Sequence, residues 1–125
     1  MKKLDKSSVL KQFEESGEMI YNGSLTGDYK TCNRENDKLI KIYKFFEKDK
    51  NFAWECISEM LKSSNVVVRV KAASYCLALN MHTDIAQETL IEIRDDDSNG
   101  IFSFNAEMTL KVWKEKGCLR VYLPK

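Results

Sequence analysis

The sequence has little that would break a helix and no stretch that would span a membrane. It contains one proline and five glycines among 125 residues, and this scarcity of helix breakers favours long helices over many short strands. No strictly alternating run of apolar and polar residues indicates a half-buried strand. No window approaches the roughly 18 consecutive apolar residues of a transmembrane helix. We therefore expect an all-helical protein with no membrane partner.

An excess of charge of one sign is also missing. The 20 basic and 19 acidic residues leave a net charge of +1, whereas proteins that bind nucleic acid are usually one-sidedly basic. We therefore expect no nucleic-acid partner. Met1–Asp5 is positively charged but precedes no apolar segment, so we expect no signal peptide. The cysteines have no C-x-x-C spacing, which indicates reduced thiols and a cytoplasmic location. They are Cys32, Cys56, Cys76 and Cys118.

The motifs of common catalytic and nucleotide-binding sites are absent. The sequence has no phosphate-binding loop, dinucleotide fingerprint, zinc-protease helix or nucleophile elbow. His82 is the only histidine, which argues against a zinc site and a histidine-based triad. The cysteines fall mostly on apolar stripes, where a thiol behaves as a small hydrophobic group. Cys32, near a helix start, is a remote candidate for a reactive thiol. We therefore expect no catalytic residue, no metal and no cofactor, and we do not expect an enzyme.

Apolar residues recur with the spacing of amphipathic helices along the whole chain. The length suits one domain spanning residues 1–125. The pattern predicts about six helices, at residues 7–22, 29–46, 52–62, 66–79, 84–94 and 101–116. Helix 66–79 is apolar around most of its circumference, which predicts a buried central helix. The charged residues of the segment 30–44, including Glu35, are most simply a solvated face.

Helices 29–46 and 101–116 carry less regular apolar patterns. Asn36 interrupts the apolar stripe of helix 29–46. A buried amide without partners costs about 1–3 kcal/mol, so we expect a hydrogen bond that fixes helix register, the alternative being a stretch that faces a partner. Helix 101–116 has two apolar stripes, and we expect both to be buried. They are Ile101, Phe104, Met108 and Val112, and Phe102, Ala106, Leu110 and Trp113.

The start of helix 66–79 aligns without gaps with the start of helix 101–116, at an offset of about 34 residues that is typical of helical solenoid repeats. The alignment matches Asn65 with Asn99, Val68 with Phe102 and Ala72 with Ala106, among others. The segment 65–73, NVVVRVKAA, resembles the second helix of a HEAT repeat. This resemblance implies a short α–α superhelix of stacked helix pairs, clearest in residues 52–117. In HEAT repeats an arginine of the second helix often pairs with an aspartate at the repeat turn. Here Asn65 stands at the turn, and the position that matches Arg69 in the next helix pair is Ser103. The series of Arg–Asp pairs that runs along a long HEAT array is therefore missing.

The loop before helix 101–116 is strongly acidic. Asp95, Asp97 and Asn99 match the first ligand positions of a calcium loop. The final ligand position holds Ala106 instead of a carboxylate, which argues against calcium. The simplest interpretation is a polar turn in which Ser98 or Asn99 caps the next helix. The alternative is an acidic docking patch for a basic partner, made by Asp95, Asp96, Asp97 and Asn99.

Residues 100–114, GIFSFNAEMTLKVWK, resemble the C-terminal signature of a small bacterial α-superhelical family of uncharacterised proteins. Some members resemble immunity proteins of polymorphic toxin or contact-dependent inhibition systems. The resemblance covers roughly residues 60–117. It implies a protein-binding inhibitor that occludes the active site of a cognate, nuclease-type toxin, whose cationic surface would suit the acidic patch.

Two other function classes remain. A general helical-repeat adaptor would bind a cellular protein and would have no toxin partner. An enzyme or DNA-repair scaffold on a HEAT-like fold would need a basic groove with aromatic side chains, which the interleaved acidic and basic residues do not indicate.

Overall fold

The computed structural model describes residues 5–121. Within this range the chain forms six α-helices and one short 3-10 helix, and no strand. The bounds are α1 Lys6–Thr26, α2 Tyr29–Lys48, α3 Lys50–Met60, α4 Val66–Ala78, α5 Thr83–Asp95, η1 Asp97–Asn99 and α6 Ile101–Lys116. The predicted all-helical class is confirmed. None of the helices in the described range is both long and apolar enough to cross a membrane.

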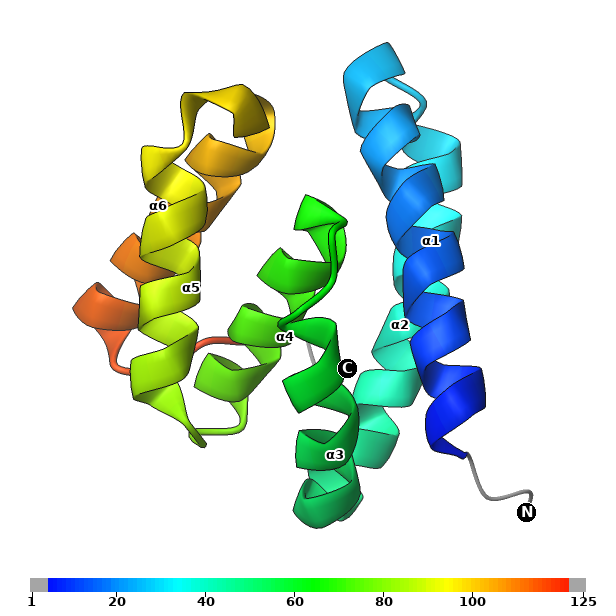
Figure 1. Cartoon of the computed structure of the whole chain (residues 1–125), viewed down its shortest axis with the longest axis vertical. Coiled ribbons are helices and arrows are strands. Elements are labelled where there is room, and N and C mark those ends of the chain that lie inside the picture. The colour runs from blue at the N-terminus through cyan, green and yellow to red at the C-terminus, as the bar shows by residue number, and fades with distance from the viewer. Residues whose placement is uncertain (1–4, 122–125) are drawn as a thin grey trace.

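Helix α4 lies at the centre of the molecule. It contacts α1 and α3 on one side and α5 and α6 on the other (Figure 1). Val68, Ala72 and Cys76 of α4 are completely buried. The predicted central helix is therefore confirmed, and the three valines that open it are helical.

One apolar core extends through all six helices. Aromatic rings connect its N-terminal part: Phe13 of α1 packs on Phe46 of α2 with ring centroids 6.4 Å apart, and both rings contact Tyr75 of α4. Such ring pairs add about 0.5–1.5 kcal/mol beyond the area that they bury. The hairpin of α1 and α2 is thereby fixed against the central helix.

Side chains that accept hydrogen bonds from orphan backbone N–H groups mark most helix starts. The sequence offers Asp28 and Thr26 as caps of α2, and Asp28 is the cap: it accepts from the backbone N of Thr31 at 3.2 Å. Asp49 alone separates α2 from α3 and accepts from the backbone N of Phe52 at 3.1 Å. Helix α3 therefore begins at Lys50, and the predicted start at residue 52 is wrong because Asp49 already supplies the cap.

Helix α1 continues four residues beyond its predicted end at Asn22. Gly23 does not break it, because this glycine is where α2 packs closely: a Cβ atom there would lie 2.8 Å from Cys32 Sγ. Thr26 extends the helix by donating its hydroxyl to the carbonyl oxygen of Asn22 at 3.0 Å. The helix ends at Gly27, whose φ of 77° is left-handed and favours glycine.

A second glycine sets the distance between α1 and α4. A Cβ atom on Gly17 would lie 2.6 Å from Val68 Cγ2 and 3.4 Å from Asn65 Nδ2. Neither neighbour moves easily, since Val68 is completely buried and Asn65 caps α4 by accepting from the backbone N of Val67 at 2.8 Å. The close approach at Gly17 positions the following turns of α1 beside α4.

Glu35 of α2 is buried, with 1% of its surface exposed, so its prediction as part of a solvated face is wrong. Its Oε1 accepts from Ser16 Oγ of α1 at 2.8 Å, and its Oε2 accepts from Arg34 Nε at 3.2 Å and Lys38 Nζ at 3.0 Å. Burial alone would raise the pKa of Glu35. The hydrogen bonds from Lys38, Ser16 and Arg34 outweigh that effect and hold its pKa below the ordinary value. This paired carboxylate ties α2 to α1.

The start of α5 differs from the prediction. The sequence favours Thr83 as the cap of this helix, but Thr83 is the first helical residue. His82 holds the cap position with a left-handed φ of 49° and no side-chain hydrogen bond to the helix. The His82 ring instead stacks on Trp54 of α3, with centroids 3.6 Å apart. The apolar spacing within residues 84–94 predicts that Ile85, Ala86, Leu90 and Ile93 are buried. This is wrong for Ile85, which is 42% exposed, and right for the other three.

Candidate functional site

Helix α6 buries only one of its two apolar stripes. Phe102, Ala106 and Leu110 are at most 3% exposed, as expected. Ile101, Phe104 and Met108 are 48%, 59% and 39% exposed, so the prediction that both stripes are buried is wrong. This stripe is exposed because α6 packs on α5 and α4, and no further helix of the described chain covers the other side of α6. Three large apolar side chains therefore face solvent along one helix.

A cavity of about 200 Å³ lies between this part of the molecule and the α1–α2 hairpin. Four helices line it. Ile20 and Ser24 come from α1, Cys32 and Asn36 from α2, Val67, Val70 and Lys71 from α4, and Phe102 and Asn105 from α6. Tyr21 of α1 stacks on Phe102 at 5.0 Å and bridges the same two parts of the chain. The cavity thus lies where segments far apart in sequence meet.

Two further cavities extend from the first. A cavity of about 430 Å³ shares Val70, Lys71 and Asn105 with it and adds Phe104 and Met108 to its walls. A third cavity of about 490 Å³ shares Leu119 and Arg120 with the second and includes Lys116. We call the three adjoining cavities the α4–α6 groove. It begins at the α1–α2 hairpin, follows α4 and α6, and ends at the segment 117–121.

The charged side chains of the α4–α6 groove all have the same sign. Among the described lining residues they are Lys71, Lys116 and Arg120, and no carboxylate joins them. No carboxylate within residues 5–121 forms a salt bridge with these cations. Burial lowers the pKa of Lys71, an effect that the charge of the nearby Cys32 thiolate would oppose. The groove therefore presents positive charge without a carboxylate partner in the described chain, on a surface of mixed apolar and neutral polar groups.

Asn36 does not form the register-fixing hydrogen bond that its position predicts. Its Oδ1 atom is buried and has no hydrogen-bond partner within the described chain. An unsatisfied buried acceptor of this kind costs about 1–3 kcal/mol. Asn36 lines the first cavity of the groove, but its Oδ1 atom is itself inaccessible, so the alternative, in which this stretch of α2 faces a partner, stays a prediction.

The four predicted partner-binding residues lie together at the turn between α5 and α6, and three of them have structural roles there. Asp95 pairs with Arg94 at 2.9 Å, and Asn99 Nδ2 donates to the carbonyl oxygen of Ile93 at 3.0 Å. Asp96 accepts from the backbone N and the hydroxyl of Ser98 at 3.0 and 2.6 Å. Asp97 is exposed and opens η1. That this turn forms a docking patch stays a prediction.

The turn does not cap α6 as the sequence suggests. Gly100, with a φ of 56°, holds the cap position, and no side chain caps the helix. Hydrogen bonds from the Ser98 side chain and backbone lower the pKa of Asp96, and the positive charge of Arg69 on α4 adds to this. Within residues 5–121 no group of three His, Cys, Asp or Glu side chains could hold a metal ion. Ala106, at the final calcium-ligand position, is completely buried.

The cysteines are all free. Burial raises the pKa of the Cys56 thiol to about 11 and that of the Cys76 thiol to about 12, so both stay protonated at neutral pH. Cys118 is exposed and Cys32 partly buried, at the rim of the first cavity. Cys56 and Cys76 therefore act as small apolar core residues, as the sequence indicates.

No family model, curated protein or solved structure matches this chain. On the surface of the protein an exposed apolar stripe borders a groove whose charged lining residues are all cations. Sequence reasoning did not identify Lys71, Asn105 or Arg120 as site residues. The sequence of α4 carries two cations, Arg69 and Lys71, and no pattern in it distinguishes the one that opens into a cavity.

Proposed function

We propose that this protein acts by binding another protein rather than by catalysis. The observation that supports this proposal is the exposed stripe of Ile101, Phe104 and Met108 on α6, beside the α4–α6 groove. Contiguous exposed apolar side chains on a folded protein commonly mark a surface that a partner covers. Aromatic and methionine side chains are also enriched in the centres of protein interfaces.

We further propose that helix pairs α3–α4 and α5–α6 are HEAT-like repeats. The aligned positions Val68 and Phe102 are both buried, and so are Ala72 and Ala106. The positive charge of Arg69 acts on Asp96 at the next turn, as the arginine of a HEAT repeat does with its aspartate. The equivalence is incomplete, because Asn65 caps its helix and Asn99 does not.

Within the protein-binding class, we propose an immunity protein that neutralises a cognate, nuclease-type bacterial toxin in the cytoplasm. The support is the resemblance of residues 100–114 to a family with immunity-like members. The same segment contains the exposed stripe of α6. Inhibition by occlusion needs a shaped surface and no reacting group. A general adaptor would share that surface, and only the partner separates the two.

The experiment is co-expression of the tagged chain with the protein encoded beside its gene. The immunity proposal predicts a stoichiometric complex that survives high salt, and rescue of growth when the neighbouring protein is toxic. A complex with a housekeeping protein in place of the toxin would support the adaptor. If no protein forms a stoichiometric complex with the chain in its native host, protein binding itself is refuted.

The acidic turn has its own test, which the structure makes sharper. Asp96 holds η1 through Ser98, so replacing it would disturb the turn itself. The double variant Asp95→Asn and Asp97→Asn removes two exposed charges and keeps that contact. If the turn docks on a cationic toxin, this variant should mainly slow association, and more so at low salt. An unchanged association rate would exclude the turn from the interface.

A further inference from the structure

The walls of the α4–α6 groove define what it can hold. Its second cavity is bordered by apolar groups of Val70, Phe104, Met108, Leu119 and Val121. Its charged lining residues, from the first cavity to the third, are cations only. An occupant must therefore bury apolar surface and carry negative charge, because a basic occupant would leave like charges facing one another.

Lys71 is the strongest recognition point in the groove. It lines both the first and the second cavity, is partly buried, and has no carboxylate partner within residues 5–121. Removing an ammonium group from water is costly unless an opposite charge replaces the lost hydration. Burial accordingly lowers the pKa of Lys71. A carboxylate entering the cavity would stabilise the charged form of Lys71 and accept a charge-assisted hydrogen bond from it.

The side chains of Asn36 and Asn105 add neutral polar groups to the walls of the same cavity. Amide side chains of this kind can exchange hydrogen bonds with a peptide backbone. An extended peptide provides N–H donors along its backbone and carboxylates on its side chains. Nucleic acid fits less well, because three cations spread along the whole groove do not form the continuous cationic track that a phosphate backbone prefers.

We propose that the α4–α6 groove binds an extended, acidic and apolar segment of a protein partner, with one carboxylate at Lys71. This assignment rests on the proposed protein-binding function and specifies its site and the chemistry of the partner. Apolar side chains next to the carboxylate cover Phe104 and Met108. The acidic turn is a separate surface of opposite charge, so the two surfaces select for different parts of a partner.

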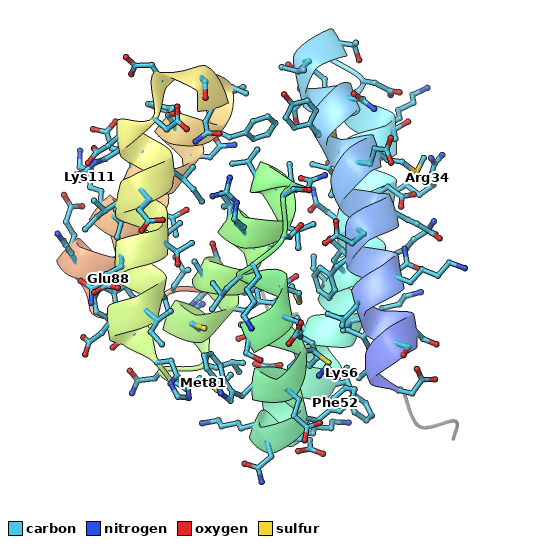
Figure 2. All side chains as sticks on the ribbon, viewed as in Figure 1. Lys6, Arg34, Phe52, Met81, Glu88 and Lys111 are labelled. Atoms are coloured by element: carbon cyan, nitrogen blue, oxygen red, sulfur yellow. The ribbon has the colours of Figure 1, made fainter. Side chains whose placement is uncertain are left out.

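The test is selection from a displayed library of random peptides against the full chain. The expected result is enrichment of sequences in which Asp or Glu neighbours aromatic or aliphatic residues. Affinity of a selected peptide for Lys71→Gln should fall roughly tenfold or more, the size of one lost charge-assisted hydrogen bond. Lys111→Gln is the matched control: this α6 residue is exposed, and Figure 2 shows it at the outer edge of the molecule. The selected peptide should bind Lys111→Gln and the native chain with equal affinity.

A charge reversal makes the selection diagnostic. With Lys71→Glu, the enriched peptides should change from acidic to basic while their apolar residues persist. Circular dichroism and a melting curve establish that each variant is folded, which we expect because Lys71 has no ion pair to lose. Selection of no peptide, or of peptides without acidic residues, would overturn the proposal. So would equal affinity for the native chain and Lys71→Gln.

Other occupants give distinct results. Tight binding of a labelled oligonucleotide that Lys71→Gln abolishes would overturn the proposal in favour of nucleic acid. Self-association of the native chain that Lys71→Gln abolishes would identify a second copy as the occupant. A partner from the co-expression experiment that binds the native chain and Lys71→Gln equally would refute the groove assignment while the proposed function stands. If no partner binds either chain, the proposed function fails.

Discussion

Replacing Gly17 by alanine tests how α1 is placed against α4. In an unobstructed helix this change stabilises a protein by roughly 0.5–1 kcal/mol, because glycine loses more backbone entropy on folding. Here the new Cβ would lie 2.6 Å from Val68 Cγ2, a completely buried atom with no free space to enter. Overpacking of this kind costs about 1–3 kcal/mol. Since the second effect is larger, Gly17→Ala should lower the free energy of unfolding by about 1 kcal/mol.

The effect of Gly17→Ala on stability should change from destabilising to stabilising once the side chain of Val68 is shortened. Val68→Ala alone should destabilise the protein by about 2 kcal/mol or more, since it removes two buried methyl groups and leaves a cavity. In that background Gly17→Ala should become stabilising, because its Cβ fills part of the vacated space. Urea denaturation of the native chain, both single variants and the double variant gives the coupling energy. A Gly17→Ala effect that is stabilising and equal in both backgrounds would refute the packing described here.

The remaining predictions concern a buried charge, a helix cap and the thiols. The pKa of Glu35 in the folded protein lies below its ordinary value. The ionised carboxylate therefore contributes its full stabilisation at pH values above the ordinary pKa, and this stabilisation is lost as the pH falls through the pKa of the folded state. Glu35→Gln should therefore flatten the pH dependence of urea denaturation between about pH 5 and pH 3. Asp49→Ala should lower the unfolding free energy by about 1–2 kcal/mol, and unchanged stability would contradict its role as the cap of α3. With a thiol reagent at neutral pH, Cys118 should react at once, and Cys56 and Cys76, with pKa values raised to about 11 and about 12, only on unfolding.

Most of the helical framework could be predicted from local chemistry. Asp28 caps α2, and Gly117, with a φ of 69°, ends α6 at the predicted residue. These boundaries depend on hydrogen bonds and backbone angles within a few residues, and the residue types at those positions predict them. The predicted end of α1 at Asn22 was wrong because it depends on packing between helices. Gly23 serves a close approach to Cys32 on another helix, and local sequence does not distinguish such a glycine from a turn.

The candidate site was harder to predict because it depends on what each helix face meets. Periodicity shows that Phe102 and Phe104 both belong to apolar stripes of α6, but not that one stripe has no neighbour. Glu35 and Lys71 each read as ordinary charged residues of a helix. Only the packing shows that the first is buried against Ser16 and that the second opens into a cavity.

The most direct test of the central claim is photo-crosslinking in the native host. A photoreactive amino acid replaces Phe104, which is 59% exposed beside the groove. A control variant carries the photoreactive amino acid in place of Glu88, an exposed residue that Figure 2 places at the outer edge of α5. We expect one discrete protein adduct at position 104, through an acidic segment of the partner, and none at position 88. No adduct at position 104, the same adducts at both positions, or an adduct to nucleic acid would contradict it.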